Sequence, residues 1–336
     1  MGYDRIDSEN CAVIGYGSWA TAIVKTLTVN GRRVEWYVRN DRVLDSLRAT
    51  GHNPKYLPYV GIDRSLIAPS NDLNAVVAAS SAVVLAAPSA FLKDFLAPLS
   101  VPLAGKRVVS AVKGIIPGDY KTVVEYMCDQ YSLPLSDMAV VTGPSHAEEV
   151  GIGRLSYLTV ASTDSEGARA VGGMLANDYV RCNYSCDVLG VEYAAILKNV
   201  YAIAVGMAVG LGYGDNFLAV LIANCAREMA HYLERKLPAA QRDTATSAYL
   251  GDLLVTCYSP LSRNRRLGNL IGRGCSVKSA LNEMTMIAEG YYAADCIRRV
   301  GAVEAMAMPI ADMVYDVLYS AAPARESMAR LTAELI

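Results

Sequence analysis

The sequence predicts two domains: an α/β domain with a doubly wound, mainly parallel sheet over residues 1–188, and an all-helical domain over residues 189–336. Three observations indicate this division. A glycine turn separates two apolar segments near the N-terminus, further apolar segments alternate with helical ones up to about residue 187, and no clear strand-like alternation follows. Near-continuous apolar strands that alternate with helices are typical of a parallel sheet covered on both faces.

The first strand–helix–strand segment carries a glycine pattern. Residues 11–14 and 34–38 are expected to be strands, and the turn after the first holds Gly15, Gly17 and Ala20 in the spacing G-x-G-x-x-A. Gly15 permits a tight turn, Gly17 lets the backbone approach a pyrophosphate, and the small Ala20 lets the helix pack on the strand. The N-terminus of that helix then faces the phosphates. The pattern predicts a Rossmann-type nucleotide-binding domain, and a merely structural turn is the alternative.

The end of the second strand bears on the choice of cofactor. In NAD-specific sites an acidic residue usually binds the ribose 2′-hydroxyl at this place. This sequence has Arg39 there, followed by Asn40. A guanidinium can bind the 2′-phosphate of NADP, so the sequence favours NADP(H), with NAD(H) still possible. The alternative is a solvated arginine that stacks on the adenine of either cofactor.

Four further strands are expected in the first domain, at residues 82–87, 107–112, 139–142 and 157–161. In sheets of this kind, ligands bind at the carboxyl ends of the strands. Lys113 directly follows one of these strands, and its ammonium is therefore expected in the ligand crevice. The alternative is an ordinary exposed lysine in a turn.

The helical half begins with a long apolar stretch, residues 191–216. Between Glu192 and Asp215 its only formal charge is Lys198. A lysine among apolar helical turns either extends its ammonium to water or holds it in a closed site. Burial would lower the pKa of the amine, which suits proton transfer near neutral pH.

Small and polar residues mark two further helical segments. Gly206 and Gly210 lie four residues apart and leave a smooth strip where another helix or a ligand can approach closely. Asp252 and Thr256, also four apart, share one face of a later helix. Taken alone, Asp252 can also be interpreted as an acidic residue at a helix N-terminus, where its charge interacts favourably with the helix dipole.

A basic cluster follows Ser259-Pro260. Ser262 can cap the next helix, and three arginines and an asparagine occupy its first turn. Arginines at a helix N-terminus oppose the helix dipole, so an anion is the expected partner. Forked guanidinium groups and free backbone amides together make a phosphate site. The alternative is a solvated basic face or an ion-pair cluster. The cluster comprises Arg263, Asn264, Arg265 and Arg266.

Composition excludes other classes of function. The net charge of −2, with acids and bases interspersed, argues against a general nucleic-acid or membrane surface. The apolar windows 75–92 and 200–213 are interrupted or shorter than the ~20 residues of a membrane span, and the N-terminal residues are polar. The 8 cysteines lack C-x-x-C pairs and only 3 histidines are present. We therefore expect a cytoplasmic protein with free thiols and no metal.

The motifs together resemble a known family. They are GYGSWATA, SAVKGI, TGPSHAEEV, LKNVYAIAVGM with GLGYGDN, GDLLVTC, SRNRRLG and AEG, and they run in the family's order from Ala12 to about Arg325. The chain resembles the NAD(P)-dependent glycerol-3-phosphate dehydrogenases of the bacterial cytoplasmic type. The resemblance implies reversible hydride transfer between NAD(P)H and dihydroxyacetone phosphate, which gives sn-glycerol 3-phosphate for glycerophospholipid synthesis.

The resemblance also assigns roles to residues. It makes Lys198 the general acid/base, places Lys113 where cofactor and substrate meet, and gives Asp252 and Thr256 supporting roles. Substrate contacts would fall on Lys113, Gly143, Ser145, Lys198, Asp252, Ser262, Arg263 and Asn264. Besides Gly15 and Gly17, cofactor contacts would fall on Ser18, Trp19, Arg39, Asn40, Tyr56, Lys113, Ala147, Arg263, Ile287 and Glu289.

Two departures from the family pattern bear on cofactor fit or rate. Ala20 replaces a glycine, and His146 stands where an aromatic such as Phe is commoner. Two rival functions remain at this point: a related two-domain dehydrogenase acting on a 3-hydroxy acid or ketopantoate, and a non-catalytic nucleotide-binding sensor. A dehydrogenase for a 3-hydroxy acid or ketopantoate would not need an arginine cluster. A non-catalytic sensor would not need a desolvated proton donor. The long apolar helices make a homodimer the expected assembly.

Overall fold

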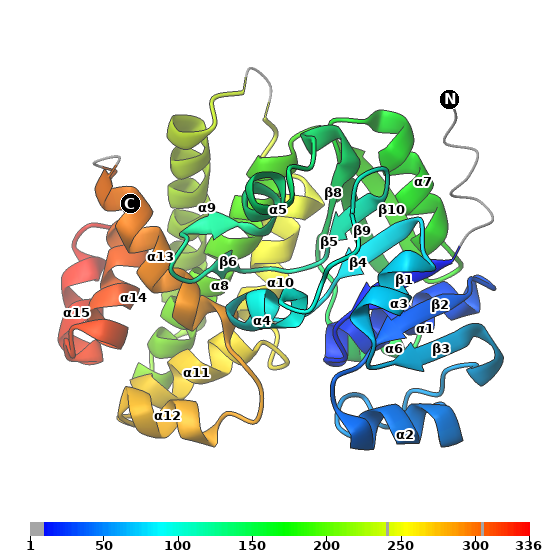
Figure 1. Cartoon of the computed structure of the whole chain (residues 1–336). Helices are drawn as coiled ribbons and strands as arrows, with labels where there is room; N and C mark the ends of the chain where they lie inside the picture. Colours follow the sequence, from blue (N-terminus) through cyan, green and yellow to red (C-terminus); the bar gives the residue numbers. More distant parts are fainter. Residues whose placement is uncertain (1–9, 240–241, 304–305) are drawn as a thin grey trace. The chain divides into compact units, whose positions relative to one another are not determined.

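The structure is a computed structural model that describes residues 10–239, 242–303 and 306–336 (Figure 1). By its internal contacts the chain divides into two units. Unit 1 comprises the described residues up to Val112 together with Val123–Val188, and unit 2 comprises Lys113–Thr122 together with Leu189–Ile336. The sequence-based division after residue 188 placed residues 113–122 in the first domain, whereas their contacts place them in unit 2. The division at 188/189 stays a prediction.

Unit 1 is built on an eight-stranded sheet with the order β10-β9-β8-β5-β4-β1-β2-β3. Its neighbouring strands are parallel except β8 and β9, which are antiparallel. The chain first extends from β1 to one side and then returns to add β4 on the other, so the strand order reverses beside β1. The strands are β1 (Cys11–Ile14), β2 (Val34–Tyr37), β3 (Ile67–Ser70), β4 (Ala82–Leu85), β5 (Arg107–Ser110), β8 (Met138–Thr142), β9 (Ser156–Ala161) and β10 (Val180–Ser185).

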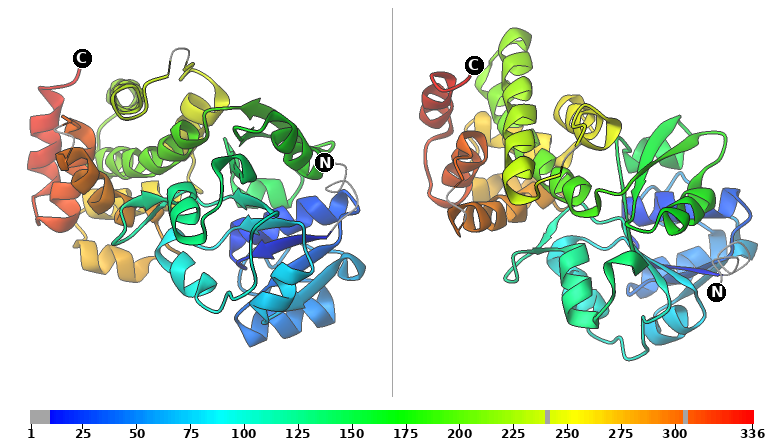
Figure 2. Two further views of the ribbon diagram at one scale, coloured as in Figure 1. Left: turned by 45° about the horizontal axis from the view of Figure 1, so that its top comes forward. Right: turned by 90° about the horizontal axis from the view of Figure 1, so that it is seen from above.

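Helices cover both faces of this sheet (Figures 1 and 2). Ala12 and Val13 point to opposite faces of β1, and each is 0% exposed. The doubly wound, mainly parallel fold predicted from the sequence is therefore confirmed. The helices are α1 (Ser18–Val29), α2 (Asp41–Thr50), α3 (Leu73–Ala78), α4 (Leu92–Leu96), α5 (Val123–Tyr131), α6 (Ala147–Gly151) and α7 (Ser165–Leu175).

Two strands of the sheet, β3 and β10, were not predicted. Both lie at the edges of the sheet. β3 contains Pro69, and most side chains of β10 are polar and at least partly exposed. Edge strands tolerate proline and polar side chains, so they can lack the continuous apolar run that indicates a central strand.

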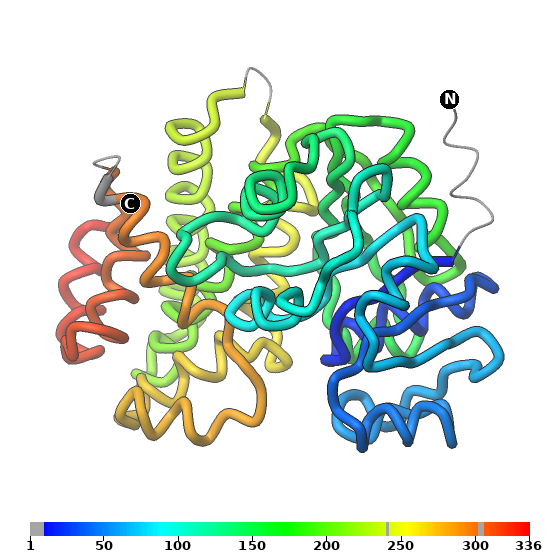
Figure 3. Tube along the Cα trace, in the orientation of Figure 1, coloured from blue at the N-terminus to red at the C-terminus, as the bar shows by residue number. Residues whose placement is uncertain are grey.

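Unit 2 is helical apart from the short hairpin of β6 (Ile115–Ile116) and β7 (Lys121–Thr122). The path of the chain through the helices of this unit can be followed in Figure 3. In the long first helix, nearly every side chain between Tyr193 and Met207 is buried. The all-helical prediction for the second half is confirmed. The helices are α8 (Val188–Leu211), α9 (Asp215–Lys236), α10 (Asp252–Tyr258), α11 (Arg263–Gly272), α12 (Val277–Glu283), α13 (Glu289–Val303), α14 (Pro309–Tyr319) and α15 (Ala324–Thr332).

Helix α8 corrects one expectation. Among the described residues it is the one helix that is long and apolar enough to cross a membrane by length and composition. The sequence windows were judged too short because the apolar run was taken to begin near residue 200. However, 83% of the most apolar window of α8 is buried inside the protein, as in the core helix of a folded domain.

Candidate active site

The glycine turn of unit 1 is shaped for a dinucleotide. Gly15 has φ +120°, and a Cβ there would lie 2.7 Å from the carbonyl oxygen of Ala86, so a side chain is excluded. A Cβ on Gly17 would meet nothing within 4 Å, which leaves the backbone open to a ligand. Helix α1 starts at Ser18 with no acidic side chain in its first turn. A pyrophosphate therefore fits at this helix N-terminus.

The loop that carries Tyr56 is fixed to this turn by Asn53, which is fully buried. The Asn53 amide donates to the carbonyl oxygen of Tyr16 (2.8 Å) and to the hydroxyl of Thr21 (2.9 Å). Its oxygen accepts from the backbone N–H groups of Lys55 and Tyr56, each at 3.1 Å. The Tyr56 ring then lies edge-on to the Tyr16 ring, with centroids 6.1 Å apart. Tyr56 is thus held beside the nucleotide turn.

Arg39 follows β2, as predicted, and lies on an aromatic platform. Its guanidinium carbon is 3.6 Å from the centre of the Phe95 ring, and one N–H donates to the carbonyl oxygen of Asp94 at 3.2 Å. The Phe95 ring is itself 6.0 Å from the Tyr16 ring. Asn40 has a structural role, because its side chain caps α2 by accepting from the backbone N–H of Val43 at 3.0 Å.

The loop after β8 holds three of the predicted contact residues. Gly143 has φ +109°, and a Cβ there would lie 2.7 Å from the carbonyl oxygen of Tyr157. The hydroxyl of Ser145 donates to the Gly143 carbonyl at 2.9 Å. Ala147 begins α6 directly afterwards, and His146 occupies the N-cap position without a side-chain capping bond. The loop belongs to unit 1.

The charged centre of unit 2 is a carboxylate between two lysines. The Asp252 side chain is 1% exposed. Its Oδ1 is paired with the ammonium of Lys198, and its Oδ2 lies 3.2 Å from the ammonium of Lys113. Lys198 is 4% exposed, so its stem does not carry the ammonium to water. The closed-site interpretation of this lysine is the one that the structure supports.

Burial and charge set the protonation of this cluster. Burial lowers the pKa of Lys198 to about 7, and the like charge of Lys113 contributes to the lowering, while Asp252 opposes it. For Asp252, burial raises the pKa, but the two ammonium groups outweigh burial and hold it below its usual value. An amine that titrates near neutral pH beside a permanent carboxylate is suited to general acid/base chemistry.

A chain of amide hydrogen bonds surrounds the cluster. The Asn199 side chain donates to the carbonyl oxygen of Lys113 at 2.7 Å, and the Asn264 side chain donates to the Asn199 oxygen at 2.8 Å. The backbone N–H of Gly290 in turn donates to the Asn264 oxygen at 2.9 Å. Thr256 adds a bond from its hydroxyl to the Asp252 carbonyl at 2.6 Å. These bonds tie the first turns of α11 and α13 to the Lys113 segment.

The arginine cluster divides into different roles. Ser262 caps α11, as predicted, by accepting from the backbone N–H of Arg265 at 3.2 Å. Arg266 lies 3.5 Å from Glu283, and both side chains are about half exposed. For Arg266 the ion-pair alternative is therefore correct, because α12 presents an acid to it. Arg263 and the buried Asn264 remain as candidates for an anion at the start of α11.

The predicted site residues divide between the two units. Unit 1 holds the glycine turn and its neighbours, and unit 2 holds the lysine–carboxylate cluster, the start of α11 and residues 287–289. Unit 1 contains Gly15, Gly17, Ser18, Trp19, Arg39, Asn40, Tyr56, Gly143, Ser145 and Ala147. Unit 2 contains Lys113, Lys198, Asp252, Thr256, Ser262, Arg263, Asn264, Ile287 and Glu289.

Three side chains at these sites were not predicted: Asn53, Phe95 and Asn199. Asn199 directly follows Lys198 in the motif LKN, so its position beside a candidate lysine was an available signal. Asn53 and Phe95 had no such signal, because their roles depend on contacts with residues more than 30 positions away.

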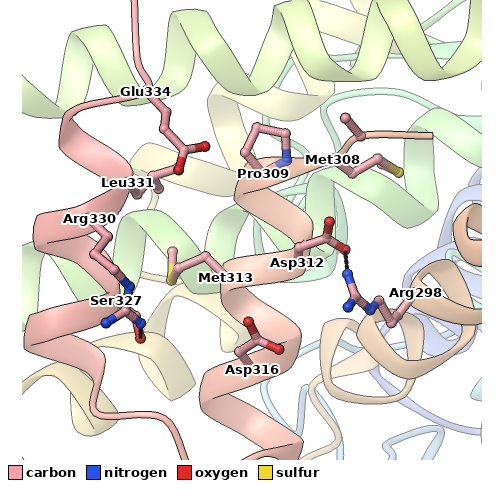
Figure 4. A pocket seen from close by; sticks show the side chains of 11 residues that line it. Arg298, Met308, Pro309, Asp312, Met313, Asp316, Ser327, Arg330, Leu331 and Glu334 are labelled. Atoms are coloured by element: carbon pink, nitrogen blue, oxygen red, sulfur yellow. Dashed lines mark hydrogen bonds and ion pairs between the residues drawn. The ribbon is translucent and has the colours of Figure 1, made fainter. Parts of the chain in front are cut away.

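A pocket elsewhere in unit 2 contributes no residue to this site. An open pocket of about 450 Å³ lies among α13, α14 and α15, and Arg298 and Asp312 form an ion pair in it (Figure 4). The described part of the chain contains no group of three or more His, Cys, Asp or Glu side chains arranged to hold a metal ion. The 8 cysteines are free thiols.

A dinucleotide-type α/β unit followed by a helical unit with a buried, carboxylate-held lysine defines a nicotinamide-dependent dehydrogenase. Comparison with models of protein families identifies the family within this class of enzymes. The model described as the N-terminus of NAD-dependent glycerol-3-phosphate dehydrogenase matches residues 10–168, and the corresponding C-terminus model matches residues 187–329. The chain belongs to the NAD-dependent glycerol-3-phosphate dehydrogenase family.

Individual relatives agree with this assignment. The chain is 37% identical over 324 residues to a glycerol-3-phosphate dehydrogenase [NAD(P)+] of Moorella thermoacetica, covering 96% of this chain and 95% of the relative. It is 36% identical to the corresponding enzyme of Geobacillus thermodenitrificans, covering 97% and 95%. The crystal structure of glycerol-3-phosphate dehydrogenase from Coxiella burnetii superposes with a TM-score of 0.90 at 28% identity, covering 97% and 99%. The predicted family and enzyme class are confirmed, and the rival functions are not favoured.

Proposed function

We propose that this chain catalyses reversible hydride transfer between NAD(P)H and dihydroxyacetone phosphate, with Lys198 as the general acid/base. The observation that carries this assignment is the buried ammonium of Lys198, which is paired with Asp252 and whose pKa is lowered to about 7. Such a group is partly protonated at neutral pH, so it serves both directions of the reaction. The product of reduction is sn-glycerol 3-phosphate, which feeds glycerophospholipid synthesis.

The chemistry has two parts. A bound reduced nicotinamide would supply the hydride, a hydrogen with its electron pair, to the carbonyl carbon and would itself become oxidised. Lys198 gives a proton to the carbonyl oxygen, where negative charge would otherwise accumulate. Lys113 adds positive potential and shares the Asp252 carboxylate. In the reverse direction the neutral Lys198 amine accepts the hydroxyl proton of glycerol 3-phosphate.

The start of α11 is proposed to bind the substrate phosphate. Arg263 offers forked N–H donors, and the N-terminus of α11 adds the positive end of the helix dipole. The buried amide of Asn264 connects this turn to Asn199, next to Lys198. Binding the phosphate would therefore orient the carbonyl of the same substrate toward the proton donor. Gly143, Ser145, Ser262 and Thr256 are proposed to complete the substrate contacts.

The cofactor is proposed to bind along unit 1 with its pyrophosphate at Gly17 and Ser18. Trp19, Tyr56, Ala147, Ile287 and Glu289 are proposed as its further contacts. We favour NADP(H), because Phe95 holds Arg39 near the end of β2, the strand end at which a guanidinium can bind a 2′-phosphate. Arg39→Ala should raise the KM for NADPH about tenfold and leave the KM for NADH unchanged within twofold. Equal changes for both cofactors would contradict the NADP(H) preference.

The cellular setting follows from the same assignment. Free thiols fit a reducing compartment, so we propose a cytoplasmic enzyme. We also propose a homodimer, supported by exposed apolar side chains that gather around α10, namely Leu254, Tyr258 and Leu261. Light scattering of the purified chain measures its mass directly, and a monomer at micromolar concentration would contradict the dimer.

The function is tested by following the loss of reduced-nicotinamide absorbance when dihydroxyacetone phosphate is added. The wild-type chain should turn over, and Lys198→Ala should lower kcat by roughly 10³-fold while NADPH binding survives. Arg263→Ala should raise the KM for dihydroxyacetone phosphate, whereas Arg266→Ala, the matched control on the same helix, should leave it nearly unchanged. Unchanged turnover in Lys198→Ala would remove this lysine from the mechanism.

A further inference from the structure

Helices α8 and α11 cross through four glycines. Gly206 and Gly210 lie on α8, and Gly268 and Gly272 lie on α11. A Cβ added at any of the four would fall closer than 3.0 Å to backbone atoms of the other helix, a distance that real Cβ atoms essentially never show. The smooth strip noted in the sequence is therefore occupied by a second helix.

The contact is reciprocal. Gly206 and Gly210 face the carbonyl oxygens of Arg265 and Asn269, and Gly268 and Gly272 face those of Ile203 and Met207. On each helix the contacted carbonyls lie three residues before the two glycines, so both helices use the same surface. Glycines four residues apart let helix backbones touch directly, with weak Cα–H···O bonds between them.

Backbone contact fixes the spacing of the two helices more tightly than side-chain packing does. Helices ordinarily pack with their axes about 8–10 Å apart, and the side chains between them can change rotamer. At a glycine crossing no side chain can adjust. The two helices therefore have one separation and one register.

A second contact independently joins the functional ends of these helices. The Asn264 side chain, in the first turn of α11, donates to Asn199 on α8, and both side chains are at least nine-tenths buried. Gly290, at the start of α13, packs against the Asn199 carbonyl and donates its N–H to Asn264. Asn199 is the residue next to Lys198, so this hydrogen bond helps to set the distance between Lys198 and the start of α11.

We propose that the α8–α11 glycine crossing is a positioning element that sets the distance between Lys198 and the phosphate-binding start of α11. This inference rests on the proposed function. Lys198 lies about two turns before Gly206, and Arg263 lies just over one turn before Gly268. The crossing thus holds both reacting groups against one short substrate and makes rapid reduction depend on its phosphate.

The test compares two ketones that differ only in the phosphate. Gly268→Ala pushes α11 away from α8 and shifts the phosphate site relative to Lys198. A displacement of about 1 Å can cost roughly 100-fold in rate. We expect kcat/KM for dihydroxyacetone phosphate to fall by about that factor, while kcat/KM for unphosphorylated dihydroxyacetone changes less than about threefold. Gly173→Ala is the matched control, because it is also a helical glycine and its added Cβ would meet nothing within 4 Å.

Each outcome decides the matter. A selective loss with the phosphorylated ketone supports the positioning role. An equal loss with both ketones means that the crossing only supports the fold, and no loss with either means that the spacing is not limiting; both results overturn the inference. A wild-type chain that does not reduce dihydroxyacetone phosphate overturns the proposed function instead. If Gly268→Ala does not fold, as judged by circular dichroism, Gly272→Ala one turn farther along α11 is measured in the same way.

Discussion

Two of the carboxylates that unit 2 buries, Asp252 and Glu228, are held in different ways. Asp252 is 1% exposed and lies between the ammonium groups of Lys198 and Lys113. Glu228, on α9, is 8% exposed and accepts hydrogen bonds from the backbone N–H groups of Ile310 and Ala311 at 2.8 and 3.0 Å. The first is held by charge, and the second caps a helix.

The surroundings move the two pKa values in opposite directions. Two cations outweigh burial at Asp252 and lower its pKa. At Glu228 burial prevails and raises the pKa to about 7, although the two backbone N–H groups and the nearby Tyr201 hydroxyl lower it and Asp312 raises it further. Counter-charge keeps a buried carboxylate ionised, whereas neutral donors do so only in part. The comparison therefore separates a carboxylate that is proposed to support the chemistry, Asp252, from one that caps a helix, Glu228.

The largest expected effect is the loss of the Asp252 charge. Asp252→Asn should lower kcat for dihydroxyacetone phosphate by roughly 10²–10⁴-fold, because two ammonium groups then repel each other without a carboxylate between them. Glu228→Gln is the matched carboxylate-to-amide control and should keep kcat within about twofold. Steady-state kinetics measure both. Similar losses of kcat in the two variants would contradict the proposal that Asp252, and not Glu228, supports the reaction.

The next effect is the dependence of rate on pH. In the proposed mechanism reduction needs the protonated Lys198, so kcat/KM for dihydroxyacetone phosphate should fall about tenfold per unit as pH rises above about 7. Oxidation of glycerol 3-phosphate needs the neutral amine and should rise through the same pH. In Asp252→Asn both inflections should move to lower pH, because Asp252 raises the pKa of Lys198. Inflections that stay in place in this variant would contradict the pairing.

The smallest effect is on stability and belongs to Glu228. Its pKa rises from 4.5 to about 7 on folding, so its contribution to stability is complete below about pH 4.5 and is lost as pH rises through 7. The loss amounts to about 3 kcal/mol. Urea unfolding at pH 5 and pH 8 measures it, and Glu228→Gln should reduce the difference between the two. An unchanged difference in this variant would assign the pH dependence to another group.

The glycine turn, the central strands and the candidate lysines could be predicted because each is encoded in a short stretch of sequence with a recognisable pattern. Gly15 and Gly17 form a spacing, and Lys198 is a lone charge in an apolar run. Contacts between segments that are distant in the chain produce no such local pattern. The platform of Phe95 under Arg39, the pairing of Arg266 with Glu283 and the capping of α14 by Glu228 all join residues between 17 and 83 positions apart. The edge strands β3 and β10 were missed because polar side chains weaken their pattern.

The segment 113–122 has a consequence for how the enzyme is made. Although it lies between β5 and α5 in the chain, it belongs to unit 2, and the ammonium of Lys113 reaches a carboxylate 139 positions later. Contacts so distant along the chain form late in folding and, during synthesis, only after their second partner has left the ribosome. An interrupted or truncated chain that stops before residue 252 can thus complete the strands of unit 1 without ever forming the cluster of Lys113, Lys198 and Asp252.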